Sequence, residues 1–196
     1  MKKENFDYTN ATVRLWLLAF QTGDLLRMCT ERLFSEYDIT TENYDVLVTV
    51  KYLGDRVNIV QIANWLRRSP NSISMLVDRM VKAGLVRRVR DRRDRRVVYV
   101  SVTSKGEHIL EVANPGCWEV IKAILAPLSY EERRTFLSLF DVINRQALQY
   151  LNPGEDVQGM MEKREDLHAE LMKRLPPYAW MTASEPKHQG GKKKKL

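Results

Sequence analysis

The chain has little cysteine, no metal-binding spacing and no apolar run long enough to cross a bilayer. Only two cysteines occur among its 196 residues, and neither belongs to a CxxC pair, so a disulfide scaffold and a zinc site are poor interpretations. Glycine-rich phosphate loops and the HExxH and GxSxG motifs are absent, and the three histidines are isolated. We therefore expect no catalysis, no cofactor and no metal. The polar sequence after Met1 shows no signal peptide, which predicts a cytoplasmic protein without membrane association.

The positive charge of the chain is concentrated in one quarter of its length. Residues 58–106 contain twelve Lys and Arg against three Asp and Glu, a surplus of nine, whereas the whole chain carries +7. The other three quarters are therefore close to neutral, and such localisation is typical of a nucleic-acid footprint. With 44% hydrophobic residues, the chain can build one sizeable core and an oligomer interface but hardly two independent cores.

Residues 69–84 predict a short amphipathic helix with well-marked ends. Ser69 is placed to cap it, Pro70 takes the first helical position and Gly84 closes it. One face is apolar and the other is polar or basic, which suits either a solvated surface helix or insertion into a DNA major groove. The apolar stripe consists of Ile73, Leu76, Val77, Met80 and Val81, and the opposite face of Asn71, Ser72, Met75, Arg79 and Lys82.

The residues that follow predict two strands joined by an arginine-rich turn. Residues 85–90 and 96–102 have strand character, and Val98, Val100 and Val102 alternate onto one face. Residues 87–96 hold seven arginines and two aspartates, a density that costs self-repulsion unless an anion is close. A solvated charge run is the other interpretation, but arginine at a hairpin tip suits phosphate oxygens and the narrow minor groove. Helix and wing together favour duplex DNA as the partner.

Two further helices are predicted upstream, over residues 39–54 and 58–68. Asn58 is expected to cap the second one. Trp65 is expected to pack at the edge of the core, with base stacking as the remote alternative. The buried face of the second helix is predicted to consist of Ile59, Ile62, Ala63 and Leu66.

Residues 62–110 resemble the winged-helix core of the MarR-type (multiple antibiotic resistance regulator) transcription factors, and the resemblance extends more weakly over residues 12–150. It implies a fold that is mainly α with a small β wing, namely a winged helix-turn-helix flanked by N- and C-terminal dimerisation helices. The matching pieces are, in order, Ile62-Ala63, Val77-Asp78-Arg79-Met80, Lys82-Ala83-Gly84-Leu85-Val86, Asp91-x-Arg93-Asp94-x-Arg96 and Val102-Thr103-x-x-Gly106.

The resemblance also implies which residues contact DNA. Side chains on the recognition helix would approach bases and phosphates, the wing arginines would hold the minor groove or its phosphates, and Asp94 would brace them. The expected DNA-binding residues are Arg67, Arg68, Ser69, Asn71, Ser72, Ser74, Met75, Arg79, Arg92, Arg93, Asp94, Arg95 and Arg96.

The flanking segments predict helices that pair two protomers, although part of each apolar stripe must also serve the protomer's own core. Residues 9–36 carry more apolar side chains than a lone outer helix needs, and residues 128–147 carry a second stripe. Ser104-x-x-Glu107 is a candidate capping box for the helix between them, which Asn114-Pro115-Gly116 should kink or interrupt. The expected dimerisation residues are Trp16, Leu17, Phe20, Phe136, Leu139, Phe140 and Ile143.

The end of the chain exceeds the usual length of the family. An added amphipathic helix is predicted over residues 155–175, with Tyr178, Trp180 and Met181 as an anchor behind it. Cys29 lies in an apolar context and is expected to be packed and unreactive. The expected division is an N-terminal dimerisation helix (1–38), a DNA-binding winged helix-turn-helix core (39–104), C-terminal dimerisation helices (105–151), the extra helix and anchor (152–181) and a disordered Lys-rich tail (182–196).

The sequence as a whole predicts a homodimeric repressor that binds a pseudo-palindromic operator in double-stranded DNA. Release by a small apolar or phenolic ligand is part of this hypothesis. Two alternatives stay open, namely an activator and a winged-helix module that mediates protein–protein contacts without ligand control. The seven arginines favour DNA, because a module that binds only proteins does not need them.

Overall fold

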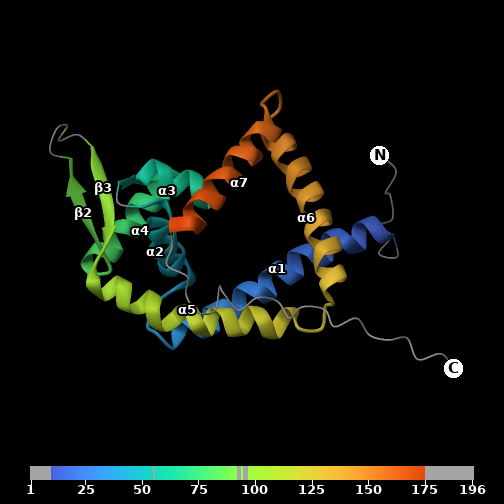
Figure 1. The fold of residues 1–196 in the computed structure, drawn as a ribbon, viewed down its shortest axis with the longest axis horizontal. Coiled ribbons are helices and arrows are strands. Elements are labelled where there is room, and N and C mark those ends of the chain that lie inside the picture. The colour runs from blue at the N-terminus through green and yellow to red at the C-terminus, as the bar shows by residue number, and fades with distance from the viewer. Residues whose placement is uncertain (1–9, 55, 92–93, 95–96, 175–196) are drawn as a thin grey trace, which may run out of the picture. The chain divides into compact units, whose positions relative to one another are not determined.

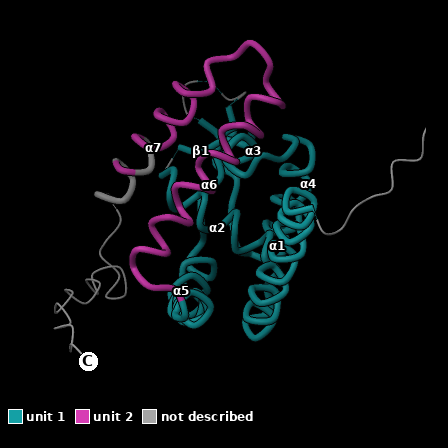
Figure 2. Tube along the Cα trace, turned by 90° about the vertical axis from the view of Figure 1, so that its right-hand side faces the viewer, with its two compact units in different colours: residues 1–127 teal, residues 128–196 magenta. Residues whose placement is uncertain are grey.

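The computed structural model describes residues 10–54, 56–91, 94 and 97–174. The chain divides into two compact units, residues 1–127 and residues 128–196, which we describe separately (Figure 2). The predicted anchor and tail over residues 175–196 lie outside the described residues.

The described elements of the first unit are helices and the three strands of one small sheet (Figure 1). Its sheet has the order β1-β3-β2 and is antiparallel throughout, with Val57 opposite Val100 and Arg90 opposite Val98. The mainly helical fold with a small β wing is therefore confirmed. The elements are α1 (Ala11–Ser35), α2 (Thr41–Leu53), β1 (Val57–Asn58), α3 (Ile59–Leu66), α4 (Pro70–Lys82), β2 (Val86–Arg90), β3 (Val98–Val102) and α5 (Ser104–Leu125).

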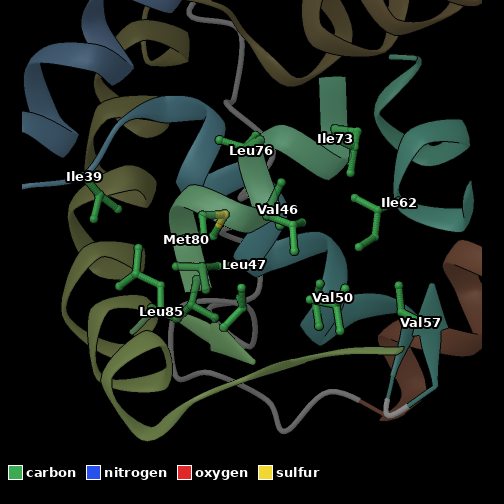
Figure 3. Close-up of a cluster of buried hydrophobic side chains, with 14 of the residues drawn as sticks. Ile39, Val46, Leu47, Val50, Val57, Ile62, Ile73, Leu76, Met80 and Leu85 are labelled. Atoms are coloured by element: carbon green, nitrogen blue, oxygen red, sulfur yellow. The ribbon is translucent and has the colours of Figure 1, made fainter. Parts of the chain in front are cut away.

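The core of this unit lies where α2, α3 and α4 meet the sheet (Figure 3). Val46, Leu47 and Ile62 are fully buried, as expected for apolar residues that recur at helical spacing. The C-terminal part of α1 joins this core through Phe34, whose ring stacks on Tyr44 with centroids 4.1 Å apart. Helices α2 and α3 and the sheet thus share one core with α4, and this core holds α4 in place.

The two helices predicted upstream form as α2 and α3. Of the face predicted to be buried on α3, Ile62 and Ala63 are buried, whereas Ile59 and Leu66 are half-buried. Asn58 caps α3 and forms a reciprocal capping box with Gln61. Trp65 packs on Tyr52, with ring centroids 4.9 Å apart, as the core-edge interpretation predicted. One strand was missed, because the two residues of β1 are too few to show any alternation.

One prediction about α5 was wrong, and of the kink or interruption predicted at Pro115 the interruption does not occur. The cap is Thr103, not Ser104, because the Thr103 hydroxyl accepts the hydrogen bond from the Gly106 N–H and Ser104 already lies within the helix. The helix also continues through Pro115 without interruption, although proline lacks the N–H that would bond the preceding turn. Asn114 is buried there and accepts a hydrogen bond from the Tyr44 hydroxyl at 2.7 Å, which ties this turn to α2.

The second unit contains α6 (Tyr130–Leu151) and α7 (Val157–Arg174). Ser129 caps α6 as the first residue of a capping box with Glu132, and hydrogen bonds from the Ser129 backbone and side chain lower the pKa of that carboxyl. Helix α7 occupies the place of the predicted extra helix, and Val157 at its start is buried. Within the described residues of both units, no helix is long and apolar enough to cross a membrane.

Candidate nucleic-acid interface

The recognition helix α4 is held by its apolar side and shows its polar side to solvent. Ser69 caps it by accepting a hydrogen bond from the Ser72 N–H, and Pro70 is its first residue. Gly84 follows its end with φ +74°, a left-handed conformation that glycine adopts without strain. Of the predicted apolar stripe, four residues are buried but Val81 is 38% exposed, so that part of the prediction was wrong. The buried residues are Ile73, Leu76, Val77 and Met80.

The opposite side of α4 forms a continuous polar and basic face, which we call the reading face. Its exposed members are Asn71, Ser72, Met75, Arg79 and Lys82. The Ser72 hydroxyl lies 2.8 Å from the Ser69 hydroxyl, so these two predicted DNA-binding residues share one hydrogen bond at the start of the helix. Because the apolar side is fixed in the core, the reading face cannot rotate inward.

Arg88 on β2 connects the wing to α4 and was missed by the sequence analysis. Its guanidinium lies 2.8 Å from an Asp78 carboxylate oxygen and donates to the Ser74 hydroxyl at 3.2 Å. Ser74 is half-buried, so its hydroxyl is held from the strand and is less open to a base than the reading face is. This contact joins residues 14 positions apart, which no local pattern in the sequence could reveal.

We expect the Asp78–Arg88 pair to contribute a coupling free energy of about 0.2–1 kcal/mol to folding, because both side chains are partly exposed and screened by water. A double-mutant cycle with Asp78→Ala and Arg88→Ala, measured by urea unfolding, checks this value. Arg87→Ala is the matched control, since neighbouring strand residues point to opposite faces of a sheet. A coupling of zero would show that the ion pair contributes nothing to the free energy of unfolding.

The turn between α3 and α4 carries two of the predicted DNA-binding arginines, and they differ in their surroundings. Arg67 is exposed and adopts a left-handed conformation with φ +53°. Arg68 lies 4.0 Å from a Glu42 carboxylate oxygen on α2. Burial raises the pKa of the nearby Asp45 carboxyl, Arg68 opposes that shift and Glu42 adds to it. Arg68 thus serves to anchor the turn to α2 as well as to supply charge.

The tip of the wing is organised by Asp91, directly after β2. Its side chain is only 11% exposed, accepts a hydrogen bond from the Asp94 N–H at 3.0 Å and lies 3.9 Å from the Arg56 guanidinium. The Asp94 carbonyl in turn accepts from the Val97 N–H at 2.9 Å. The predicted contact residues Arg92, Arg93, Arg95 and Arg96 lie outside the described residues, so the brace predicted for Asp94 stays a prediction.

The predicted dimerisation residues are exposed in the single chain. Trp16 and Phe20 are 65% and 59% exposed and their rings pack on each other at 4.9 Å. Within the second unit, the apolar stripe of α6 is likewise open, and an apolar hollow of about 370 Å³ lies at the start of that helix. The stripe includes Phe136, Leu139, Phe140 and Ile143.

The two cysteines lie in different environments. Cys29 is exposed on α1 in the single chain, so the packing expected for it does not occur within the protomer. Burial raises the pKa of the half-buried Cys117 thiol, a hydrogen bond with Tyr44 opposes this and Asp45 adds to it. Cys117 is therefore a protonated, weakly nucleophilic thiol at neutral pH.

Comparisons with known proteins decide the family of this chain. Residues 39–98 match the MarR family. The transcriptional regulator HosA of Escherichia coli O127:H6 is 32% identical over 104 residues, which cover 52% of this chain and 75% of HosA. The chain belongs to the MarR family. The regulator PecS of Dickeya dadantii is also similar, at 26% identity over 62% of this chain and 74% of its own length.

Solved structures of MarR and of another transcriptional regulator share the fold. A mutant of MarR from E. coli, complexed with operator DNA, superposes with a TM-score of 0.63 at 22% identity and covers 70% of this chain and 98% of MarR. The organohalide-sensing regulator RdhR in its 2,4-dichlorophenol-bound form gives a TM-score of 0.68 at 18% identity, over 79% of this chain and 93% of RdhR. These likenesses show that the winged-helix architecture is that of the MarR family.

Proposed function

We propose that this MarR-family protein is a sequence-specific transcriptional regulator that binds double-stranded DNA as a homodimer. The observation that carries the proposal is the reading face of α4, which is polar and basic, exposed, and fixed in place by four buried residues on the other side of the helix. A helix of this kind fits the major groove, where side chains can distinguish all four base pairs. The arginine-rich wing next to it supplies charge for the phosphates.

The exposed apolar residues of α1 and α6 support the dimer. Rings such as Trp16 and Phe20 are exposed to water in the single protomer, and covering them with a second copy lowers the free energy. Two recognition helices related by a two-fold axis then bind two related half-sites, which predicts a pseudo-palindromic operator. The family is one of transcriptional regulators, so we expect no catalysis, and we expect the protein to act in the cytoplasm on DNA there.

Repression released by a small apolar or phenolic ligand is the mode of regulation that we favour. RdhR, which shares this fold, has been solved with 2,4-dichlorophenol bound. Activation is the second candidate, because the relative BadR of Rhodopseudomonas palustris, at 29% identity over 58% of its length, is a transcriptional activatory protein. A reporter fused to the selected DNA site distinguishes the two by the sign of its response when the gene is deleted.

We expect Asn71→Ala and Ser72→Ala to reduce discrimination between a selected duplex and a random duplex, by about 1–3 kcal/mol for each base that the variant no longer reads. The selected duplex is obtained by enrichment of a randomised pool on the wild-type protein, and titration of both duplexes at one salt concentration gives the two affinities. Gln149→Ala, an exposed amide on α6, is the matched control. Equal decreases in affinity for both duplexes would assign these side chains to phosphates, and failure to enrich any sequence would refute the proposed function.

A further inference from the structure

The start of α5 forms hydrogen bonds with the chain at the end of the recognition helix. The Lys105 ammonium donates to the carbonyl of Ala83 at 3.0 Å, and the Thr103 hydroxyl donates to the carbonyl of Gly84 at 2.6 Å. The Thr103 N–H also donates to the Leu85 carbonyl, at 3.1 Å. Three consecutive carbonyl groups after α4 are therefore held by two residues of another element.

Gly106 closes this contact because there is no room for a side chain. A Cβ placed there would fall on the Leu85 carbonyl oxygen and lie 2.7 Å from Val102 Cγ1 and 3.0 Å from Leu47 Cδ2. The backbone of α5 thus lies directly against the chain that leaves α4. We call Thr103, Lys105 and Gly106 the α5 clasp.

The position of Lys105 has an electrostatic reason. The last carbonyl groups of a helix lack partners within the helix and carry partial negative charge, so a cation beside them is stabilising. Two residues further along, Glu107 forms an ion pair with Lys51 of α2 at 2.8 Å. The start of α5 is therefore attached to both α4 and α2, while α1 packs along the same helix.

We propose that the α5 clasp sets the orientation of the recognition helix relative to α5, and that Lys105 is a positioning residue for DNA recognition which does not itself contact a phosphate. The inference rests on the proposed function, because the orientation of α4 matters only if α4 reads bases. In a dimer whose two protomers pair through their outer helices, a fixed angle between α5 and α4 gives both reading faces one defined separation.

The experiment compares Lys105→Met, Lys105→Arg and the control Lys122→Met, which removes the same charge from the last turn of α5. Affinities for the duplex selected by the wild-type protein and for a random duplex are measured at several salt concentrations. Lys105→Met is expected to bind the selected duplex alone about three- to tenfold more weakly, the size of effect of one exposed hydrogen bond at a helix end, with an unchanged salt slope. Lys105→Arg is expected to restore most of the affinity, and Lys122→Met to match the wild type.

Two results would overturn the inference. An equal decrease in affinity for both duplexes, with a salt slope lower by about one unit, would make Lys105 a phosphate contact. An unchanged affinity for the selected duplex would show that the clasp does not position α4. If the wild-type protein selects no duplex, the proposed function fails.

In that case hydrogen exchange tests the clasp directly. The Leu85 N–H donates to the Met80 carbonyl at 2.9 Å and closes the end of α4. This amide is expected to exchange several-fold faster in Lys105→Met than in Lys122→Met, and equal rates would refute the clasp. Gly106→Ala gives a second variant, expected to displace the chain at Leu85 and to weaken binding of the selected duplex more than Lys105→Met does.

Discussion

Replacing Trp16 and Phe20 by glutamate is expected to convert the protein into a monomer that binds an operator-length duplex at least about a hundredfold more weakly than the wild type. The two rings form one exposed aromatic pair on α1, and a charge at that place would have to be buried in a dimer interface. The decrease in DNA affinity is large because two linked half-site contacts exceed one by about 10²–10⁴ in avidity. Analytical ultracentrifugation and duplex titration give the two quantities.

The matched control is Thr22→Glu, compared with the single variant Phe20→Glu. It adds the same charge to α1 at an exposed position that a helical period of 3.6 residues places away from Trp16, Leu17 and Phe20. The control is expected to remain a dimer. A wild-type protein that sediments as a stable monomer, or an aromatic variant that stays dimeric, would contradict the dimer interface that we propose.

The recognition helix was predictable because its local signals agree. The capping serine, the proline at the first position and the glycine after the end all mark the boundaries that α4 has. Periodicity also gave its buried face, with Val81 as the exception, because that residue lies at the edge of the stripe near the helix end. Helix ends and apolar spacing are local properties, and local properties can be read from a sequence.

Contacts between distant residues were not predictable. Arg88 and Lys105 appeared only as members of a basic run, yet each holds a group on or after α4 that lies 14 or 22 positions away. Charge density showed where a nucleic acid would bind, but it could not separate the cations that face solvent from those that fasten one element to another. Thr103 was missed as a cap for a related reason, since serine and threonine stand side by side and the geometry decides between them.

Arg93→Ala combined with Arg95→Ala is expected to weaken binding to all duplexes by about ten- to a hundredfold and to flatten the plot of log affinity against log salt by about two units. Each phosphate that the variant no longer neutralises lowers that slope by about one unit, because one counterion fewer is released. Titration of a selected and a random duplex at several salt concentrations measures both effects. Arg145→Ala with Arg134→Ala, on the exposed surface of α6, removes the same charge elsewhere. An equal effect in that control would show that the wing arginines act only through the net charge of the protein.

The two aspartates of the wing provide the sharper test of its shape. Counting charges alone predicts that Asp91→Ala and Asp94→Ala both tighten binding, since each removes a negative charge next to DNA. The Asp91 carboxylate, however, accepts the Asp94 N–H and is nearly buried, so its removal should open the turn and weaken binding. Asp94→Ala keeps both backbone hydrogen bonds of the turn, and it therefore isolates the side chain that we expect to orient a neighbouring arginine. Weaker binding in both variants at two salt concentrations supports a wing whose conformation, and not only its charge, determines DNA affinity. Tighter binding in Asp94→Ala would refute the hypothesis that the Asp94 side chain orients an arginine, and only the role of Asp91 in the turn would remain.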